Sequence, residues 1–276
     1  MSLLRKILER LVDIADNDRA PFDLRVSLGL VPGWSIMSAM GERESMGTTV
    51  SGEDIWRGND LTPAPTSHTT IPTPASAGEQ MEVVSESASD SSIGTGVQSV
   101  TIDYLTATGA EPRSVIVTLA GTTPVQLPAS IRFVQDMHSY TTGVNGVAAG
   151  HIKVRQTSTP GRVYNMIAQG GNKSLVPLRM VPAGRLLLLR SWHAEEAQSK
   201  RCAFRIRSTS IHGDRRPGVF LFKGVGYLKQ TTSGDIPLQV AIPELAIVKV
   251  SGWPVVSGAE GSTGWWGFLV DLSQAT

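Results

Sequence analysis

The fold is decided by residues 55–121, which read IWRGNDLTPAPTSHTTIPTPASAGEQMEVVSESASDSSIGTGVQSVTIDYLTATGAEPRSVIVTLAG. The stretch opens on a tryptophan–glycine turn, continues through a segment rich in proline and threonine, and ends in alternating apolar and polar residues. Prolines among threonines and serines favour extended backbone, whereas a period of two predicts β-strands. We therefore expect a connecting strap over 59–78 and a β-domain from residue 79 onward.

Beyond residue 79, short alternating segments separated by turn-forming residues continue to the end of the sequence. Residues 97–119 predict a hairpin, and Leu186–Leu189 predicts a central strand buried on both faces. About a dozen strands at this spacing are typical of a sandwich or jelly roll. The prediction is a mainly β protein with an antiparallel β-sandwich of the jelly-roll type over 79–276, within which 191–276 is a candidate subregion.

Chain length, net charge and hydropathy narrow the class of protein further. The chain has 276 residues, which is enough to bury a sizeable core. It carries 25 Lys and Arg against 24 Asp and Glu, so its net charge of +1 gives no global reason to expect nucleic acid. No run of about 18 apolar residues is present, and we expect neither a membrane anchor nor an export signal.

Residues 1–58 are predicted to form an arm rather than part of the β-domain. Residues 4–15 place apolar side chains at three- and four-residue spacing, which predicts an amphipathic helix. That helix could pack on its own chain or a copy of it, on another protein, or on a membrane surface. Residues 22–58 are too apolar to stay solvated, and too often interrupted by glycine and proline to build a core alone. We expect them to cover a neighbouring surface.

Metal and cofactor sites are not predicted. Cys202 is the single cysteine, which excludes an intrachain disulfide and a cysteine-rich zinc site. Because Cys202 alternates with Phe204 and Ile206, we expect a buried, inert thiol. No two histidines lie at i, i+2 or i, i+4, so no metal site is expected from His68, His138, His151, His193 and His212.

No catalytic residue is predicted either. Residues 170–174 (GGNKS) lack the spacing of a phosphate-binding loop, so they predict a glycine turn. Glu195, Glu196 and Asp214 could be read as paired carboxylates for glycoside cleavage. However, Glu195 and Glu196 are adjacent in a polar segment, where solvated side chains are the simpler interpretation.

Two surface features remain as candidate contact sites. Arg205 and Arg207 alternate with the apolar residues of their strand and should point outward, toward acidic residues of a neighbouring subunit, toward solvent, or less plausibly toward nucleic acid. Trp265 and Trp266 are adjacent, so they point to opposite faces of a strand and one should be exposed. We favour a subunit interface for them over a glycan platform or ordinary core packing.

Several segments resemble virion structural proteins of tailed bacteriophages. The resemblance is carried by the IWRG turn and the strap, by residues 77–109, by RFVQDMHSYTTGVNGVAAGHIKV (132–154), by VPAGRLLLL (181–189) and by LGLVPGWSIMSAMG (28–41). It covers most of residues 28–190, and none of these elements is a catalytic signature. It implies a β-rich capsid-decoration, collar or tail-fibre-like component of the virion, assembled in the bacterial cytoplasm.

The resemblance also suggests partners. These are other virion proteins (capsid, portal or collar, or tail subunits) and further copies of the same chain, with a trimer preferred by analogy. The arm would attach to the particle through Leu28, Leu30, Trp34, Ile36 and Trp56. The alternative function is recognition of a host glycan through Trp265 or Trp266.

Overall fold

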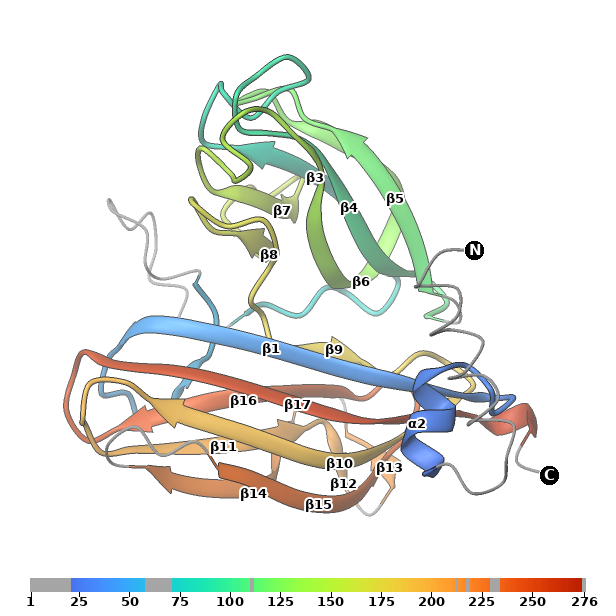
Figure 1. The fold of residues 1–276 in the computed structure, drawn as a ribbon. Helices are drawn as coiled ribbons and strands as arrows, with labels where there is room; N and C mark the ends of the chain where they lie inside the picture. The colour runs from blue at the N-terminus through green and yellow to red at the C-terminus, as the bar shows by residue number, and fades with distance from the viewer. Residues whose placement is uncertain are drawn as a thin grey trace, which may run out of the picture.

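The computed structural model describes residues 21–57, 71–109, 112–211, 213–216, 219–228 and 234–274. The helix predicted over 4–15 and most of the strap lie outside these residues. The described chain forms two β-bodies, a sandwich and a second body inserted into it, stacked as Figure 1 shows. The mainly β class predicted from the alternating pattern is therefore confirmed.

The sandwich contains two antiparallel sheets. Sheet A has the order β1–β17–β10–β15 and sheet B the order β14–β11–β16–β2, with β9 also paired to β16. Their bounds are β1 (Trp34–Met46), β2 (Glu53–Asp54), β9 (Arg179–Met180), β10 (Arg185–Glu196), β11 (Cys202–Ser208), β14 (Leu221–Leu228), β15 (Gly234–Ile242), β16 (Ile247–Pro254) and β17 (Ala259–Asp271).

The order of these strands is that of a jelly roll. Without the short β9, the eight strands counted along the chain follow the order 1-8-3-6 in sheet A and 5-4-7-2 in sheet B. In this arrangement the first strand pairs with the last and the second with the second to last, as two Greek keys require. The predicted jelly-roll sandwich is confirmed, although its strands come from both ends of the chain.

The inserted body occupies the connection between β2 and β9. It is a six-stranded antiparallel sheet of order β5–β4–β6–β3–β7–β8, with its own apolar core. The predicted hairpin over 97–119 is confirmed as β4 and β5. The strand bounds are β3 (Glu79–Ser85), β4 (Val97–Thr106), β5 (Pro112–Thr118), β6 (Val125–Thr142), β7 (Ile152–Gln156) and β8 (Val163–Ile167).

A third apolar cluster joins the two bodies. Trp56 from the sandwich side packs with Leu105 and Phe133 of the inserted body, and with Leu178 and Met180 of the connection that returns to the sandwich. The bodies also approach closely at Gly41, where a Cβ would lie 2.2 Å from Cδ of Pro177. Any side chain at residue 41 would collide with this connection.

The interpretation of residues 1–58 as an arm without its own core is wrong for the part that the structure describes. β1 pairs with β17 from Trp34↔Val270 to Met46↔Ala259, and Trp56 is fully buried in the junction. The single glycine and the three methionines of β1 obscured its alternation, while its partner strand lies more than 200 residues away. The division into 1–58 and 79–276 therefore does not describe the bodies of this fold, and 191–276 belongs to the sandwich.

Burial follows strand alternation within the sandwich. Cys202, Phe204 and Ile206 of β11 are fully buried between the sheets, as predicted. In β10, Leu187 and Leu189 are fully buried whereas Leu186 and Leu188 are only partly covered. The prediction that this leucine run is buried on both faces is wrong, because among the described residues only one short helix, Phe22–Ser27, covers the outer face of sheet A, and it does so at one end.

The remaining elements are short. A helix, α2 (Phe22–Ser27), lies beside one end of β1, and Phe22 contacts the ring of Trp34 at 5.0 Å between centroids. The short strands β12 (Ser210–Ile211) and β13 (Asp214–Arg215) form a hairpin, and a 3-10 turn, η2 (Leu272–Gln274), follows β17.

Candidate functional site

Arg207 of the predicted basic pair forms an ion pair within its own chain. It lies on the outer face of sheet B, with Nη2 3.2 Å from Oδ1 of Asp54, and its side chain is only 12% exposed. Asp54 also accepts hydrogen bonds from Lys249 Nζ at 2.8 Å, from Ser251 Oγ at 2.6 Å and from the backbone N–H of Ile71 at 2.9 Å. We call these five residues the Asp54 centre. The acidic partner predicted for Arg207 on another subunit is thus Asp54 of the same chain.

Burial dominates the electrostatics of this centre. Desolvation lowers the pKa of Lys249 and of Arg207, and the Asp54 carboxylate opposes both shifts. Sequence reasoning missed Asp54 because its charged partners follow it by 153 and 195 residues. No local spacing could have revealed it.

Arg205 is held differently. Its guanidinium carbon lies 4.6 Å from the ring centroid of Phe222 and 4.4 Å from that of Trp253, so two aromatic rings fix its position. Within the described part of the chain, no carboxylate forms an ion pair with it. Beside it on β14, Phe222, Val225 and Tyr227 are 52%, 41% and 68% exposed. We call Arg205 and these three residues the β14 surface.

Trp265 and Trp266 point to opposite faces of β17, as predicted. Trp265 is 2% exposed and donates its indole N–H to the carbonyl of Pro177 at 3.1 Å. Trp266 is partly exposed on the outer face of sheet A and meets Phe268 edge-on at 5.6 Å. Trp265 is therefore a core residue and no longer a candidate for an interface, whereas Trp266 stays one.

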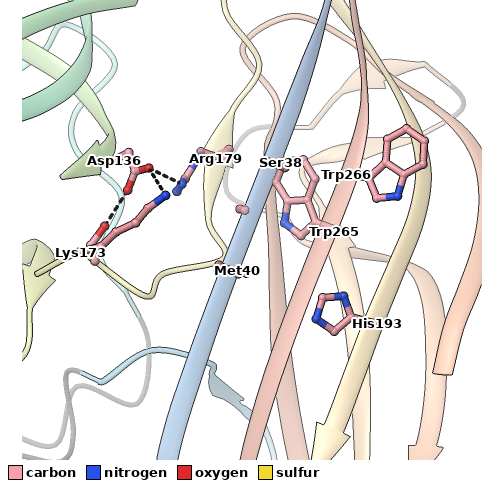
Figure 2. Close-up of a pocket in the computed structure, with 10 residues that line it drawn as sticks. Ser38, Met40, Asp136, Lys173, Arg179, His193, Trp265 and Trp266 are labelled. Carbon is pink, nitrogen blue, oxygen red and sulfur yellow. Dashed lines mark hydrogen bonds and ion pairs between the residues drawn. The ribbon is translucent and has the colours of Figure 1, made fainter. Parts of the chain in front are cut away.

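A groove runs along β1 between the two bodies, and Figure 2 shows one part of it. Two adjoining cavities of about 380 Å³ and about 440 Å³ share Ser38, Asp136 and Arg179. Residues 35–40 of β1 form one wall, and the inserted body with its return connection forms the other. We call this the β1 groove. Trp266 and His193 lie at one end of it.

The far wall of the β1 groove is a fixed polar network. Asp136 accepts a hydrogen bond from Ser174 Oγ at 2.8 Å and lies 3.3 Å from Arg179 Nη2 and 3.4 Å from Lys173 Nζ, the contacts dashed in Figure 2. Arg179 also donates to the carbonyls of Val176 and Leu178 at 3.0 and 2.9 Å. Burial lowers the pKa of Arg179, and the neighbouring Asp136 partly offsets this.

The predicted attachment residues do not form one surface. Trp56 is fully buried, Leu28 and Leu30 are partly buried, and Trp34 packs against Phe22. Ile36 alone is largely accessible, at 42% exposure, and lies in the β1 groove.

The carboxylates considered for glycoside cleavage are not brought together. Glu196 is fully buried and accepts the backbone N–H groups of Gln198 and Lys200 at 3.0 and 2.7 Å, so it organises its own loop. Glu195 is 3.5 Å from Ser262 Oγ. Asp214 lies in the β12–β13 hairpin, at the opposite end of the sandwich from the end of β10 (Figure 1).

The remaining candidates have structural roles. Cys202 is buried, as predicted, and burial raises the pKa of its thiol to about 12. Gly170 adopts a φ of 77° in the turn after β8, which confirms the predicted glycine turn. His138 and His151 lie on or beside strands of the inserted body, and His68 and His212 fall outside the described residues. Among described residues, no group of three or more His, Cys, Asp or Glu is placed to hold a metal ion.

Comparisons with known proteins add little to this geometry. No protein-family model matches the chain, and no curated protein matches it. Among solved structures, the chain is similar to one described as the structure of infectious bursal disease virus Gx strain, with a TM-score of 0.25 and 9% identity. The match covers 86% of this chain and 72% of that chain. None of the helices in the described residues has the length and apolar character needed to cross a bilayer.

Proposed function

We propose that this protein is a non-enzymatic structural component of a tailed-bacteriophage virion, in which several copies associate through their jelly-roll sandwiches. Two observations support the proposal before any surface is considered. Residues 28–190 resemble virion structural proteins, and the eight-strand order is that of a jelly roll, a fold used by viral capsid proteins as well as lectins and cupins. Since a fold does not by itself decide function, the exposed surface must supply the remaining support.

The observation that carries the proposal is the β14 surface. β14 is the terminal strand of its sheet, and three of its large apolar side chains stand in a row on the outer face. An exposed apolar row on an edge strand favours association and is normally suppressed in a monomer. Arg205, fixed between two rings and without a carboxylate among the described residues, adds a preoriented charge for a partner. Tyr and Arg, both present on the β14 surface, are among the residues that dominate binding at interfaces.

Anchoring to the capsid, collar or tail is a second part of the proposal. The residues proposed for anchoring differ from those predicted from the sequence, because Trp56 is enclosed in the junction between the two bodies. The accessible apolar side chains of β1 are Ile36 and Met40, which are 42% and 53% exposed. They lie beside Trp266, on the outer face of sheet A, which among the described residues only α2 covers, at one end.

Two measurements test the proposal. Mass spectrometry of purified particles should detect the protein, and analytical ultracentrifugation of the isolated protein should show a closed homo-oligomer, with a trimer expected. The double variant Phe222→Ser/Tyr227→Ser should weaken self-association at least roughly tenfold, as expected for loss of two apolar contacts. Ile93→Ser is the matched control, since Ile93 is 94% exposed in the inserted body. A protein that is monomeric and absent from particles would contradict the proposal.

A second candidate function, recognition of a host glycan, is favoured by Trp266. Its partly exposed ring lies near the hydroxyl of Ser38 and the imidazole of His193, both of which line the same cavity. An aromatic face with nearby polar groups suits a sugar ring. Binding to a glycan array that is lost in Trp266→Ala and retained in Tyr227→Ser would favour this candidate.

A further inference from the structure

The β1 groove exposes the edge of a strand rather than a patch of side chains. Side chains of a β-strand alternate between its two faces, yet six consecutive residues, 35–40, line the groove. Four of them, residues 35–38, line a single cavity, and consecutive residues can do so only if the backbone edge itself forms the wall. Among the described strands, β17 alone pairs with β1, so the edge of β1 that faces the groove has no strand beside it.

This edge also lacks the usual protection. Edge strands commonly carry charged side chains, proline or a bulge that prevents further pairing. Residues 35–40 read SIMSAM and contain neither charge nor proline, and the irregularity in β1 comes later, between Arg43 and Met46. Ser35, Ser38 and Met40 are exposed. A segment of roughly six residues, or about 20 Å of strand, is therefore open to pairing.

The two sides of the groove define the chemistry of a partner. Ile36 and Met40 are exposed apolar side chains on the outer face of sheet A. The opposite wall holds three cations against two carboxylates, so it carries one excess positive charge, and its charged residues are Asp103, Arg113, Asp136, Lys173 and Arg179. A strand added here would place alternate side chains beside the apolar pair and beside the cationic wall.

We propose that the β1 groove accepts an extended segment of a neighbouring virion polypeptide, which pairs with β1 and becomes an additional strand of sheet A. The segment alternates apolar residues with polar or acidic ones, to match the two sides of the groove. Strand addition of this kind obtains affinity from main-chain hydrogen bonds and specificity from alternate side chains. The inference rests on the proposed function in one respect, since a virion neighbour must supply the segment.

The test compares hydrogen exchange in the isolated protein and in purified particles. Amides within residues 35–40 should exchange at least tenfold more slowly in particles, and cross-linking from this region should join it to a peptide of a neighbouring chain. Ser38→Lys places a charge on the open edge and should reduce incorporation at least tenfold without changing the unfolding midpoint. Gln239→Lys is the matched control, because Gln239 is exposed on β15, the opposite edge strand of the same sheet.

The outcomes separate this inference from the proposed function. A protein that is present in particles, but whose residues 35–40 exchange as fast as in isolation, overturns the inference and leaves the proposed function standing. Protection of the amides of residues 35–40 that survives in Ser38→Lys also overturns the inference. Protection that disappears on glycosidase treatment overturns it in favour of a sugar ligand. A protein absent from particles overturns both.

Discussion

Each β-body contains a fully buried aspartate, and the two are stabilised in different ways. Asp54 of the sandwich, 1% exposed, is compensated mainly by the cations of Lys249 and Arg207. Asp90 of the inserted body is fully buried, and none of the ion pairs among the described residues involves it. It accepts hydrogen bonds from Ser85 Oγ at 2.6 Å and from three backbone N–H groups at 2.8 to 2.9 Å, those of Val97, Ala149 and Gly150.

The difference reflects how each body is assembled along the chain. The side-chain partners of Asp54 follow it by 153 to 197 residues, so the Asp54 centre ties β2 to β11 and β16. The partners of Asp90 lie 5 to 60 residues away and organise loops at one end of a sheet. Because distant contacts have the greater loop-closure cost, the sandwich should depend more on each long-range contact than the inserted body does.

The most severe test of this comparison is removal of residues 1–57, which deletes β1, β2 and Asp54 together. From sequence alone we expected the remaining β-domain to stay folded, but the structure predicts that the sandwich unfolds while the inserted body persists. Cys202 should then react rapidly with a thiol reagent, because burial that raises its pKa to about 12 would be lost. Amides of residues 79–167 should keep their hydrogen-exchange protection. A truncated protein with an unreactive Cys202 would contradict this view of the sandwich.

Asp54→Ala should have the next largest effect. It leaves Lys249 and Arg207 buried without their carboxylate, and breaking a buried ion pair in this way costs about 3–5 kcal/mol. All six tryptophans lie outside residues 79–167, so denaturation followed by tryptophan fluorescence reports on the sandwich and the junction. Asp214→Ala, at an exposed position, is the control and should change stability by less than about 0.5 kcal/mol. Equal midpoints for the two variants would mean that the Asp54 centre is dispensable.

Asp90→Ala should destabilise the inserted body by a smaller amount, about 3 kcal/mol. The substitution leaves three backbone N–H groups and one hydroxyl without their acceptor, but it leaves no buried cation unpaired. Hydrogen exchange of residues 79–167 is the suitable measurement, since that body contains no tryptophan. Loss of protection confined to these residues would support the independence of the two bodies, whereas an equal loss in β16 and β17 would contradict it.

Sequence patterns predicted the local features well and the long-range ones poorly. Alternation identified β11, its buried Cys202 and the outward direction of Arg205, because a strand buried on one face records that burial in its own residues. The strand β1 was missed, since Gly41 and the exposed Met40 interrupt its pattern and its partner is β17. The Asp54 centre and the β1 groove were missed for the same reason. The Asp54 centre is made by residues that only the jelly-roll order brings together, and the β1 groove forms only where the inserted body meets β1.

The smallest predicted effect is a pH dependence confined to the inserted body. The imidazole of His151 accepts the backbone N–H of Gln169 through Nδ1 at 3.1 Å, and only a neutral ring can do so. Burial lowers the pKa of His151, with Lys153 and Arg57 adding to the shift and Glu86 opposing it. The folded-state pKa is thus below the unfolded value of about 6.5, so the unfolded state binds the proton first. Stability is lost as the pH falls through 6.5 toward the folded-state pKa.

Because the ring is partly solvated, the loss should be smaller than that of either aspartate variant. Hydrogen exchange at pH 7.5 and pH 5.5, corrected for intrinsic rates, should show weaker protection around β7 and β8 at the lower pH. His151→Gln, which cannot titrate, should abolish that difference. The sandwich provides the internal control, since His151 and the contact of its Nδ1 with Gln169 lie outside it. An equal loss of protection in the sandwich would mean that the junction couples the two bodies more tightly than their separate cores indicate.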